Sequence, residues 1–405
     1  MVVIIGGGPA GMMAAISAAS NRNEVTLIEK NEYLGRKLLL TGGGRCNLTN
    51  ICESQDLIHR FSKTGSFLRD AFKALDNNEL ISFFSGRGLK PKVEEDGRVF
   101  PVTDKASSVL DILIEELKKL KVKVVASKSV KEVIVSKNSV KGVLCKDGTI
   151  IEADKVIIAT GGLSYKATGS TGDGIRIAEK LGHTIIPLRP GLAALSLKST
   201  LPERLEGVSL DGVKLIFRAD KAKLVSEPGS LIFTKKGISG PVTLSSSARV
   251  VDWLGEGKKV SLEIDIMPMF DQKEMEEVLT RKLSESPAKG VKNILKEFVP
   301  SRLSETLSEL SKIPQDKKAS QLTSKERRSL IMFLKGLKFD VANTVSLEKA
   351  QITRGGVSVK EIDPKTMESK KVKGLYFAGE IIDIDGDCGG FNLQAAFSTG
   401  YLAGS

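Results

Sequence analysis

The sequence predicts a mixed α/β fold that is built on a parallel sheet and interrupted by an insertion. Three observations support this: the chain opens with a strand–helix–strand pattern, apolar runs return at 155–158 and 375–378, and the segment 190–345 has a different pattern. Strands of a parallel sheet are buried on both faces, so they read as continuous apolar runs. The 405 residues are enough for two or three domains.

The first thirty residues predict a strand, a glycine-rich turn, a helix and a second strand. The glycines follow G-x-G-x-x-G spacing, and the stretch after them is rich in Ala and Met, which favour helix. In such a turn one glycine allows the bend, one lets a pyrophosphate approach, and one lets helix and strand pack closely. The helix start then offers free N–H groups to phosphates. This pattern is typical of a Rossmann-like dinucleotide-binding unit, whose candidate residues are Gly6, Gly8, Pro9, Ala10 and Gly11.

The second strand ends at Glu29, about 20 residues after the glycines, where an acid accepts hydrogen bonds from ribose hydroxyls. We expect the basic residues that follow to reach the pyrophosphate or the adenine side, with ordinary surface charge as the alternative. A run of three glycines then predicts a loop whose bare backbone approaches a ring system or phosphates, unless it is only flexible. The candidates of this stretch are Lys30, Arg36, Lys37, Gly42, Gly43, Gly44, Arg45 and Cys46.

Residues 121–153 alternate short β-rich runs with a turn, which predicts a small antiparallel excursion of the chain, that is, a few strands outside the parallel sheet. In it, Val130 is placed where a strand could present backbone groups to an adenine. The run 155–158 predicts a strand that returns to the central sheet beside the first strand. No later strand precedes a G-x-G-x-x-G turn, so we expect a single dinucleotide domain. The glycine turn after the returning strand adds Ala159, Thr160 and Gly161 as candidates.

The segment between the two parts of the sheet predicts an insertion that is first rich in strands and then helical. Up to about residue 268, short strand-like runs alternate with Gly and Pro turns, which favours a small β-barrel or sandwich. From 269 onward the pattern is that of amphipathic helices rich in Lys and Glu. We therefore expect a nucleotide-binding domain at 1–189 and 346–405, an inserted β-barrel at 190–268 and a helical subdomain at 269–345.

The last 30 residues predict a strand, an acidic loop and a final helix. The acidic loop lacks a Glu at the twelfth position of an EF-hand, so we expect no metal site, and a carboxylate that binds a ribityl chain fits better. The start of the last helix would stabilise negative charge on a reduced flavin, and simple docking of the helix on the sheet is the alternative. The candidates here are Gly379, Glu380, Asp385, Gly390, Asn392 and Leu393.

Composition narrows the function classes. The net charge is +12, but lysines are spread along the chain and aromatic residues make up only 5%, so nucleic-acid binding is not favoured. Two histidines without metal-ligand spacing argue against zinc, and four scattered cysteines argue for a reducing cytoplasm. No signal peptide and no apolar run long enough to span a membrane are expected. The oligomeric state stays open.

Six motifs in order, TGGGRCNLTN, ATGG, YKATGSTGDG, FTKKGISGP, ITRGGV and GEIIDIDGDCGGFNLQAAFSTGYLAG, resemble the BaiN-like family of bacterial flavoproteins. That family also contains aminoacetone oxidases and belongs to the flavoproteins that resemble fumarate reductase. Two positions depart from the family: Lys235 stands where it often has His, and Phe391 where it often has Tyr. The resemblance implies that FAD is bound by Gly6, Gly8, Ala10, Gly11, Glu29, Arg36, Lys37, Gly42, Val130, Gly379, Asp385, Asn392 and Leu393.

The resemblance implies an FAD-dependent oxidoreductase that exchanges a hydride with a small organic substrate. NAD(P)H, bound transiently, or oxygen is the expected redox partner, and no seat for a second nucleotide is expected. Arg45, Arg354 and Tyr165 lie in glycine-rich loops, so we expect them to face the flavin as catalytic residues. Two alternatives stay open: a tRNA-modifying flavoenzyme and a non-catalytic, flavin-binding redox sensor.

Overall fold

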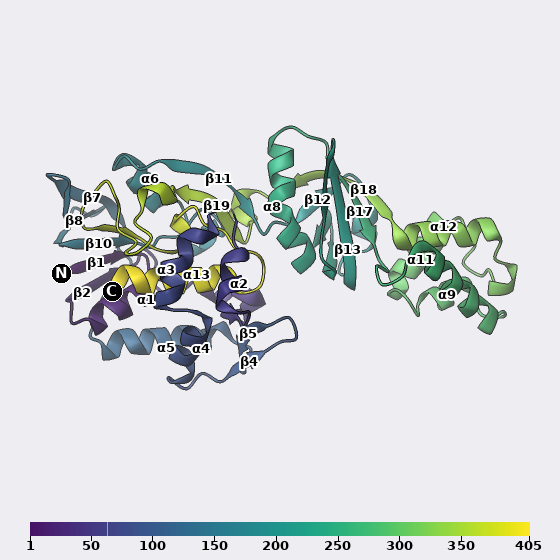
Figure 1. Ribbon diagram of the computed structural model, residues 1–405, viewed down its shortest axis with the longest axis horizontal. Coiled ribbons are helices and arrows are strands. Elements are labelled where there is room, and N and C mark those ends of the chain that lie inside the picture. Colours follow the sequence, from purple (N-terminus) through teal and green to yellow (C-terminus); the bar gives the residue numbers. More distant parts are fainter. Residues whose placement is uncertain (63) are drawn as a thin grey trace. The chain divides into compact units, whose positions relative to one another are not determined.

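The computed structural model of the protein describes residues 1–62 and 64–405. These residues form two compact units, one of residues 1–191 and 347–405 and the other of residues 192–346 (Figure 1). Each unit has a hydrophobic core of its own. The finer division of the second unit at residue 268 stays a prediction. In the part of the chain that the structure describes, no helix has the length and apolar character needed to cross a membrane.

A five-stranded parallel sheet forms the centre of the first unit. Its strand order is β20-β10-β1-β2-β6, and each neighbouring pair is parallel. Every residue of β1 and β2 is buried, which explains why both strands are apolar throughout. The α/β class and the place of β10 beside β1 are confirmed. The strands are β1 (Val2–Ile5), β2 (Val25–Ile28), β6 (Lys123–Val125), β10 (Lys155–Ile158) and β20 (Leu375–Phe377).

Helices α1 and α13 pack side by side, although one opens the chain and the other closes it (Figure 1). Glycines allow the contact, because a Cβ on Gly400 of α13 would lie 2.2 Å from the carbonyl oxygen of Ala10 in α1. The first and last segments of the chain therefore share one core. The helices of this unit are α1 (Pro9–Ser20), α2 (Ser54–His59), α3 (Arg69–Ala74), α4 (Asn77–Ser85), α5 (Ala106–Lys119), α6 (Asp173–Lys180) and α13 (Phe391–Gly404).

Three small antiparallel sheets complete the first unit. Part of the predicted excursion at 121–153 forms one of them, β7-β8-β9. Its first run differs from the expectation: β6 joins the parallel sheet beside β2, because helix α5 before it returns the chain in the direction of β2. The strands are β3 (Thr49–Asn50), β4 (Pro91–Val93), β5 (Arg98–Pro101), β7 (Val130–Ser136), β8 (Ser139–Cys145), β9 (Ile150–Glu152), β11 (Ile185–Gly191) and β19 (Ile352–Val357).

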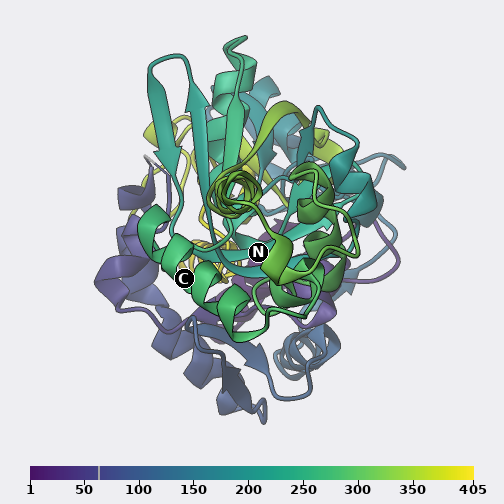
Figure 2. The ribbon, with the colours of Figure 1, turned by 90° about the vertical axis from the view of Figure 1, so that its right-hand side faces the viewer.

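The second unit contains the β-barrel that the turn pattern predicts. Its sheet runs β14-β13-β15-β16-β12-β18-β17, and β17 pairs back with β13, which closes the ring. Helix α8 packs on β13 and β15, while α9, α11 and α12 gather beyond β17 and β18 (Figures 1 and 2). The strands are β12 (Leu195–Leu197), β13 (Ser209–Ala219), β14 (Ala222–Val225), β15 (Gly229–Thr234), β16 (Gly237–Ser239), β17 (Ser261–Asp265) and β18 (Leu337–Thr344). The helices are α7 (Leu201–Arg204), α8 (Pro241–Gly255), α9 (Gln272–Glu285), α10 (Val291–Leu295), α11 (Ser301–Leu310) and α12 (Ser324–Lys335).

Candidate functional site

The turn between β1 and α1 touches protein backbone at two glycines and is open at a third. Gly6 has a φ of +108°, and a Cβ on it would lie 2.6 Å from the carbonyl oxygen of Ala159. A Cβ on Gly11 would lie 1.8 Å from the carbonyl oxygen of Gly6. Gly8 precedes α1 without a side-chain cap, and among the described residues no atom lies within 4 Å of an added Cβ there. The helix start therefore has room for an anion at its N–H groups.

Glu29, at the end of β2, is bonded to this turn. Its Oε2 accepts a hydrogen bond from the Gly7 N–H at 2.7 Å. Its Oε1 accepts from the backbone and side-chain N–H groups of Asn31 at 2.8 and 2.7 Å. The Glu29 carbonyl oxygen accepts from the Lys128 N–H at 3.0 Å, two residues before Val130 begins β7. The predicted ribose acceptor is thus in contact with the predicted phosphate turn.

Lys30 and Arg36, two of the predicted basic residues, already have partners near Glu29. The Lys30 ammonium donates to Asp173 Oδ2 at 2.7 Å, and Arg36 donates to the Asn31 side-chain oxygen at 3.1 Å. Burial raises the pKa of Asp173, but hydrogen bonds from Lys30 and Thr171 outweigh it and lower the pKa to about 2. At neutral pH the Asp173 carboxylate is therefore ionised, and its bond with Lys30 fixes the start of α6 beside the end of β2.

Lys37, the third basic residue, lies in a network that joins four segments of the chain. Its Nζ donates to Glu380 Oε2 at 2.6 Å and to Ser164 Oγ at 2.7 Å. Glu380 Oε1 in turn accepts from the Thr353 N–H at 2.7 Å and from the Ser164 hydroxyl at 3.0 Å. Thr353 Oγ1 accepts from the Ser164 N–H at 3.0 Å. The ion pair is thus held by hydrogen bonds on both sides, and its side chains are about one fifth exposed.

The same network adjoins the glycine turn. Gly35, two residues before the lysine, donates its N–H to the carbonyl oxygen of Gly7 at 2.9 Å. Gly379, next to the carboxylate, has a φ of +74°, and a Cβ on it would lie 2.7 Å from the Cβ of Ala10. A Cβ on Gly161 would lie 3.6 Å from the Glu380 carboxylate. The ion pair therefore lies at the carboxyl edge of the sheet, beside the turn that is open at Gly8.

Residues 42–44, predicted as a loop, end a short 3-10 helical segment, Leu38–Gly44, whose backbone is non-helical at Thr41, Gly42 and Gly43. All three glycines have positive φ, and no atom of the residues that the structure describes lies within 4 Å of a Cβ built on Gly43. The loop ends at Cys46, which is fully buried and has a φ of +63°. Burial raises the pKa of the Cys46 thiol to about 12, against a hydrogen bond with Thr41 that lowers it. This cysteine is protonated and enclosed at neutral pH, so its contribution is to shape the loop.

Arg45, predicted as catalytic and cofactor-binding, is surrounded by protein groups. Its Nη1 donates to Glu94 at 2.7 Å and lies 3.5 Å from a carboxylate oxygen of Asp104. The guanidinium lies 4.0 Å from the ring centroid of Phe100. Two carboxylates therefore neutralise this cation, which weakens the case for it as an anion-binding group.

The ring of Tyr165, a second predicted catalytic residue, lies near the network, with its centroid 5.9 Å from Lys37 Nζ. The residue has a φ of +52°, and its N–H donates to the Glu348 carbonyl oxygen at 2.9 Å, which fixes the backbone of the loop. Close by in sequence, the hydroxyl oxygen of Thr160 at the end of β10 is buried, and no described residue bonds to it. Tyr165 therefore lies beside the ion pair at the carboxyl edge of the sheet, whereas the Thr160 hydroxyl is buried against Gly174 of α6.

Arg354, the third predicted catalytic residue, faces the acidic loop. Its Nε lies 3.4 Å from Asp385 Oδ2. Burial and the neighbouring Asp385 raise the pKa of Asp383, and Arg354 opposes this rise. The side chain of Asn392 fixes the loop, since it accepts from the Gly386 N–H at 2.9 Å and donates to the Gly386 carbonyl oxygen at 2.8 Å. The loop is therefore held by the first turn of α13.

The start of α13 is enclosed, unlike the start of α1. Gly390 has a φ of +98°, and a Cβ on it would lie 2.5 Å from the carbonyl oxygen of Thr49 in β3. The Thr49 hydroxyl also donates to the buried Gln394 side chain at 2.6 Å. Leu393 is partly buried and packs against the core of the unit. The helix start is thus tied to the strand that follows the glycine loop at 42–44.

The predicted residues fall into two neighbouring groups in the first unit. Sequence reasoning missed three polar residues of the site, Ser164, Thr353 and Asn31, because no motif spacing marks them as functional. Thr353 lies in the ITRGGV motif, which was the one signal that could have indicated it. The carboxyl ends of β1, β2, β10 and β20 bring together Gly6, Gly8, Pro9, Ala10, Gly11, Glu29, Lys30, Arg36, Lys37, Ala159, Thr160, Gly161, Tyr165, Gly379 and Glu380, with Val130 nearby. The acidic loop, the start of α13 and the β3 segment contain Gly42, Gly43, Gly44, Arg45, Cys46, Arg354, Asp385, Gly390, Asn392 and Leu393.

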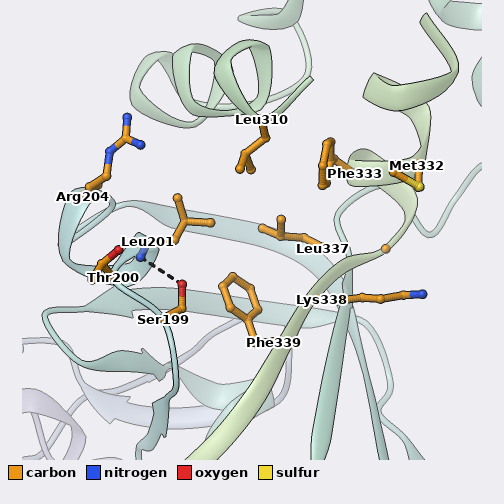
Figure 3. A pocket seen from close by; sticks show the side chains of 11 residues that line it. Ser199, Thr200, Leu201, Arg204, Leu310, Met332, Phe333, Leu337, Lys338 and Phe339 are labelled. Atoms are coloured by element: carbon orange, nitrogen blue, oxygen red, sulfur yellow. Dashed lines mark hydrogen bonds between the residues drawn. The ribbon is translucent and has the colours of Figure 1, made fainter. Parts of the chain in front are cut away.

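A pocket of about 410 Å³ lies in the second unit, and none of the predicted site residues lines it. Its walls are both apolar and polar, with Leu310, Leu337 and Phe339 around the space and Ser199, Thr200 and Lys338 also lining it (Figure 3). The Arg204 guanidinium at its edge is paired with Glu309 at 2.5 Å. The pocket therefore offers packing surface but no acid–base pair.

Comparison with known proteins identifies the family. A family model described as "HI0933-like protein Rossmann domain" matches residues 1–405. The chain is 36% identical to a 3-dehydro-bile acid delta(4,6)-reductase of Clostridium scindens, over 99% of this chain and 97% of that protein. It is 32% identical to a ribosomal RNA dihydrouridine synthase of Escherichia coli, over 98% of this chain and 96% of that protein.

A solved structure shares the fold. The 3-ketosteroid delta1-dehydrogenase of Sterolibacterium denitrificans matches with a TM-score of 0.52 at 12% identity, covering 100% of this chain and 98% of that one. At this identity the likeness concerns the fold alone. The resemblance drawn from the motifs is confirmed by the full-length match and by the relatives above 30% identity. The chain belongs to the HI0933-like family of FAD-binding Rossmann proteins and is an FAD-dependent oxidoreductase.

Proposed function

We propose that this oxidoreductase binds FAD along the carboxyl edge of its parallel sheet and reduces a carbon–carbon double bond conjugated to a carbonyl group in a small organic substrate. The main support is the convergence, from both chain segments of the first unit, of the open turn at Gly8, the acid Glu29 and the Lys37–Glu380 ion pair. The residues present therefore suit a dinucleotide.

Each part of the edge has a task in this proposal. The N–H groups at the start of α1 receive the diphosphate, because Gly8 leaves them open and the helix dipole favours negative charge. Glu29 accepts hydrogen bonds from ribose hydroxyls. Asp385 and Asn392 bind the ribityl side, and the start of α13 faces the ring. When bound, FAD supplies hydride transfer.

Reduction of a double bond also needs a proton, and Tyr165 is the best-placed donor of the three predicted catalytic residues. It lies at the carboxyl edge, and its ring is close to the Lys37 ammonium. A phenol can give up a proton to the substrate and take one back from solvent. Arg354 would orient a substrate carbonyl from β19. Arg45 is a weaker candidate, since Glu94 and Asp104 already neutralise it.

The reaction class follows from what the relatives' names describe. A delta(4,6)-reductase of a 3-dehydro-bile acid and a dihydrouridine synthase both saturate a carbon–carbon double bond beside a carbonyl group. One hydride and one proton are added, and a two-electron donor must restore the reduced cofactor. We propose a nicotinamide, bound transiently, as that donor, with oxygen as a competing acceptor.

Modification of RNA is the second candidate. Two relatives are named ribosomal RNA dihydrouridine synthases, at 32% and 33% identity over nearly the whole chain. The net charge of +12 is compatible with RNA. The small-molecule substrate is preferred because the relative with the higher identity, 36%, is named for one. These names refer to ribosomal RNA, whereas the alternative kept open from the sequence, on its N-terminal fold and basic charge, is a tRNA-modifying flavoenzyme.

The test is an anaerobic two-step experiment on the purified protein. NADH and NADPH are titrated first while the visible flavin spectrum is followed, and a 3-oxo-4,6-diene steroid is then added. The proposal expects bleaching by a nicotinamide, reoxidation by the dienone and a product two hydrogens heavier. The saturated 3-oxo steroid is the control and should not reoxidise the protein.

Three outcomes separate the candidates. Absence of bleaching by either nicotinamide removes the reductase proposal in its present form. Reoxidation by a uridine-containing rRNA fragment, but not by the dienone, favours the RNA candidate. Reoxidation by oxygen alone leaves an oxidase.

A further inference from the structure

His183, one of two histidines in the chain, is buried in the first unit between three segments. It lies in the turn between α6 and β11, and its side chain is 0% exposed. The ring packs edge-on against Phe377 of β20, with the centroids 4.9 Å apart. Its two nitrogens face Ser369 and Glu361. Both belong to residues 358–372, the connecting segment that joins β19 to β20, so the ring links this segment to a turn and to a strand of the parallel sheet.

The hydrogen bonds of Ser369 determine which nitrogen of the His183 ring carries the proton. Its Oγ accepts from the backbone N–H groups of Lys371 and Val372, each at 3.0 Å. A hydroxyl oxygen has two acceptor positions and one proton to donate. Since both positions are occupied, the Ser369 hydroxyl donates to His183 Nε2 at 2.9 Å. The ring is therefore neutral, with its proton on Nδ1, which lies 3.3 Å from Glu361 Oε2.

A second proton on the His183 ring does not fit this arrangement. It would add a donor at Nε2, where the Ser369 oxygen has no acceptor position left, so two donors would face each other in a buried place. Glu361 offers limited compensation, because its carboxylate is already paired with Lys371 at 2.8 Å and accepts from the Thr184 N–H and hydroxyl at 2.9 and 2.7 Å. Burial lowers the pKa of His183, and the Glu361 charge that opposes burial is itself offset by Lys371.

Among the described residues, the other elements around the ring add little net charge. Helix α6 ends beside it with Glu179 and Lys180, which are exposed and of opposite sign. Strand β20 presents the uncharged ring of Phe377. Glu368 of the connecting segment is directed elsewhere, since its carboxylate accepts from the Gly374 N–H at 2.8 Å. The balance of charge at the ring is therefore set by the pair within the connecting segment.

We propose that His183 is a pH-sensitive latch: the neutral ring fastens the connecting segment to the turn before β11, and the charged ring releases it. The first contact to be lost is the bond from Ser369, because protonation removes its acceptor. The two ends of the segment lead to the candidate site, since β19 contains Arg354 and β20 is followed by Glu380. Opening of the latch should therefore loosen bound FAD. This consequence rests on the proposed function, whereas the latch itself does not.

Hydrogen exchange followed by mass spectrometry tests the latch. A peptide that contains the Lys371 and Val372 amides is followed at pH 7.5 and pH 5.5, with rates corrected for intrinsic exchange. Wild-type protection should fall about tenfold, because the released ring takes up its second proton below the ordinary histidine pKa of 6.5. His183→Gln keeps an acceptor for the Ser369 hydroxyl and does not titrate, so its protection should change by less than about twofold. His59→Gln, at the exposed second histidine, is the matched control and should behave as wild type.

The link to the site is tested by the rate at which the holoprotein releases FAD at the same two pH values. Wild type should release FAD about tenfold faster at pH 5.5, and His183→Gln should release it at nearly the same rate at both. The Cε1–H resonances of the two wild-type histidines, assigned with His59→Gln, give a check by NMR titration that needs no substitution at His183.

Each result has a distinct meaning. Equal wild-type protection at the two pH values overturns the latch, as does an equal loss of protection in His183→Gln or a His183 resonance that titrates at or above pH 6.5. A segment that opens without faster release of FAD overturns the link between the latch and the site. Failure of the wild-type protein to bind FAD would overturn the proposed function, and the exchange experiment would then still decide the latch.

Discussion

Helices α1 and α13 pack against each other in one core, yet their N-termini differ. Both begin after a glycine that provides no side-chain cap. Gly8 before α1 has a φ of −81°, which any residue can adopt, and it faces open space. Gly390 before α13 has a φ of +98° and lies against the backbone of Thr49. Glycine is needed at Gly390 for the fold, whereas at Gly8 the fold would accept a side chain.

The difference between the two helix starts indicates what each one contributes to the site. A glycine that the fold does not require is best explained by a ligand that needs the space, so the start of α1 is the place for a diphosphate. The start of α13 is held by β3 and by the Asn392 contacts, so it provides a rigid wall. The contact between the helices keeps both starts at fixed positions.

The largest expected effect comes from separating the two helices. Gly400→Ala places a Cβ 2.2 Å from the Ala10 backbone oxygen, so α13 must move, and we expect a loss of about 3 kcal/mol in the free energy of unfolding. Urea denaturation followed by circular dichroism measures it. The matched control is Gly255→Ala at the end of α8, where nothing lies within 4 Å and a gain of up to about 1 kcal/mol is expected. Equal effects of the two substitutions would show that the helix contact is loose.

Gly390→Ala is expected to have the next largest effect. The alanine must adopt a left-handed φ and its Cβ would meet the Thr49 backbone, so we expect a loss of about 2 kcal/mol. Because the acidic loop depends on the first turn of α13, FAD affinity should fall as well. Differential scanning calorimetry and FAD titration measure the two effects. A protein of unchanged stability would mean that the start of α13 is as open as that of α1.

Asp173 gives a pH-dependent prediction on the α1 side of the site. Its pKa is lowered from 3.8 to about 2 in the folded protein, so its charged form adds stability above pH 3.8 that is lost as the pH falls toward 2. Asp173→Asn should therefore cost on the order of 1 kcal/mol at pH 6, allowing for the partial exposure of the pair. The difference between wild type and variant should shrink between pH 4 and pH 2 in urea denaturation. A difference that grows as the pH falls would be inconsistent with the Lys30 ion pair.

The smallest expected effect concerns Cys46, which ends the glycine loop leading to β3. Burial and the raised pKa, about 12, leave its thiol protonated and inaccessible. Iodoacetamide at pH 8 should label it only after unfolding, whereas the partly exposed Cys52 should react earlier. Peptide mass spectrometry over a time course distinguishes the two. Early labelling of Cys46 would show that the loop opens on the side of α13.

Local pattern predicted the elements of this fold better than its contacts. The spacing of Gly6, Gly8 and Gly11 and the acid at Glu29 predicted the turn because each lies within thirty residues of the others. The closure of the barrel by β17 on β13 and the parallel pairing of β6 depend on partners far along the chain.

The polar network around Lys37 and Glu380 shows that local pattern fails in the same way for the contacts of the site. Lys37 and Glu380 were both predicted as cofactor-binding residues, but nothing in their spacing indicates that they pair across 343 positions. Ser164 and Thr353 carry common polar side chains, and only the folded backbone gives them a role. Conversely, Arg45 looked suited to an anion until the structure placed Glu94 and Asp104 beside it.

The most direct test of the account is the affinity of Gly8→Val for FAD. Valine can adopt the backbone angles of this position, and its Cβ would have no described protein atom within 4 Å, so the melting temperature of the apoprotein should stay within about 2 °C of wild type. The side chain would occupy the space assigned to the diphosphate, so the dissociation constant for FAD should rise about 100-fold or more. A folded Gly8→Val protein that binds FAD as tightly as wild type would contradict the assignment of α1 as the cofactor-binding helix.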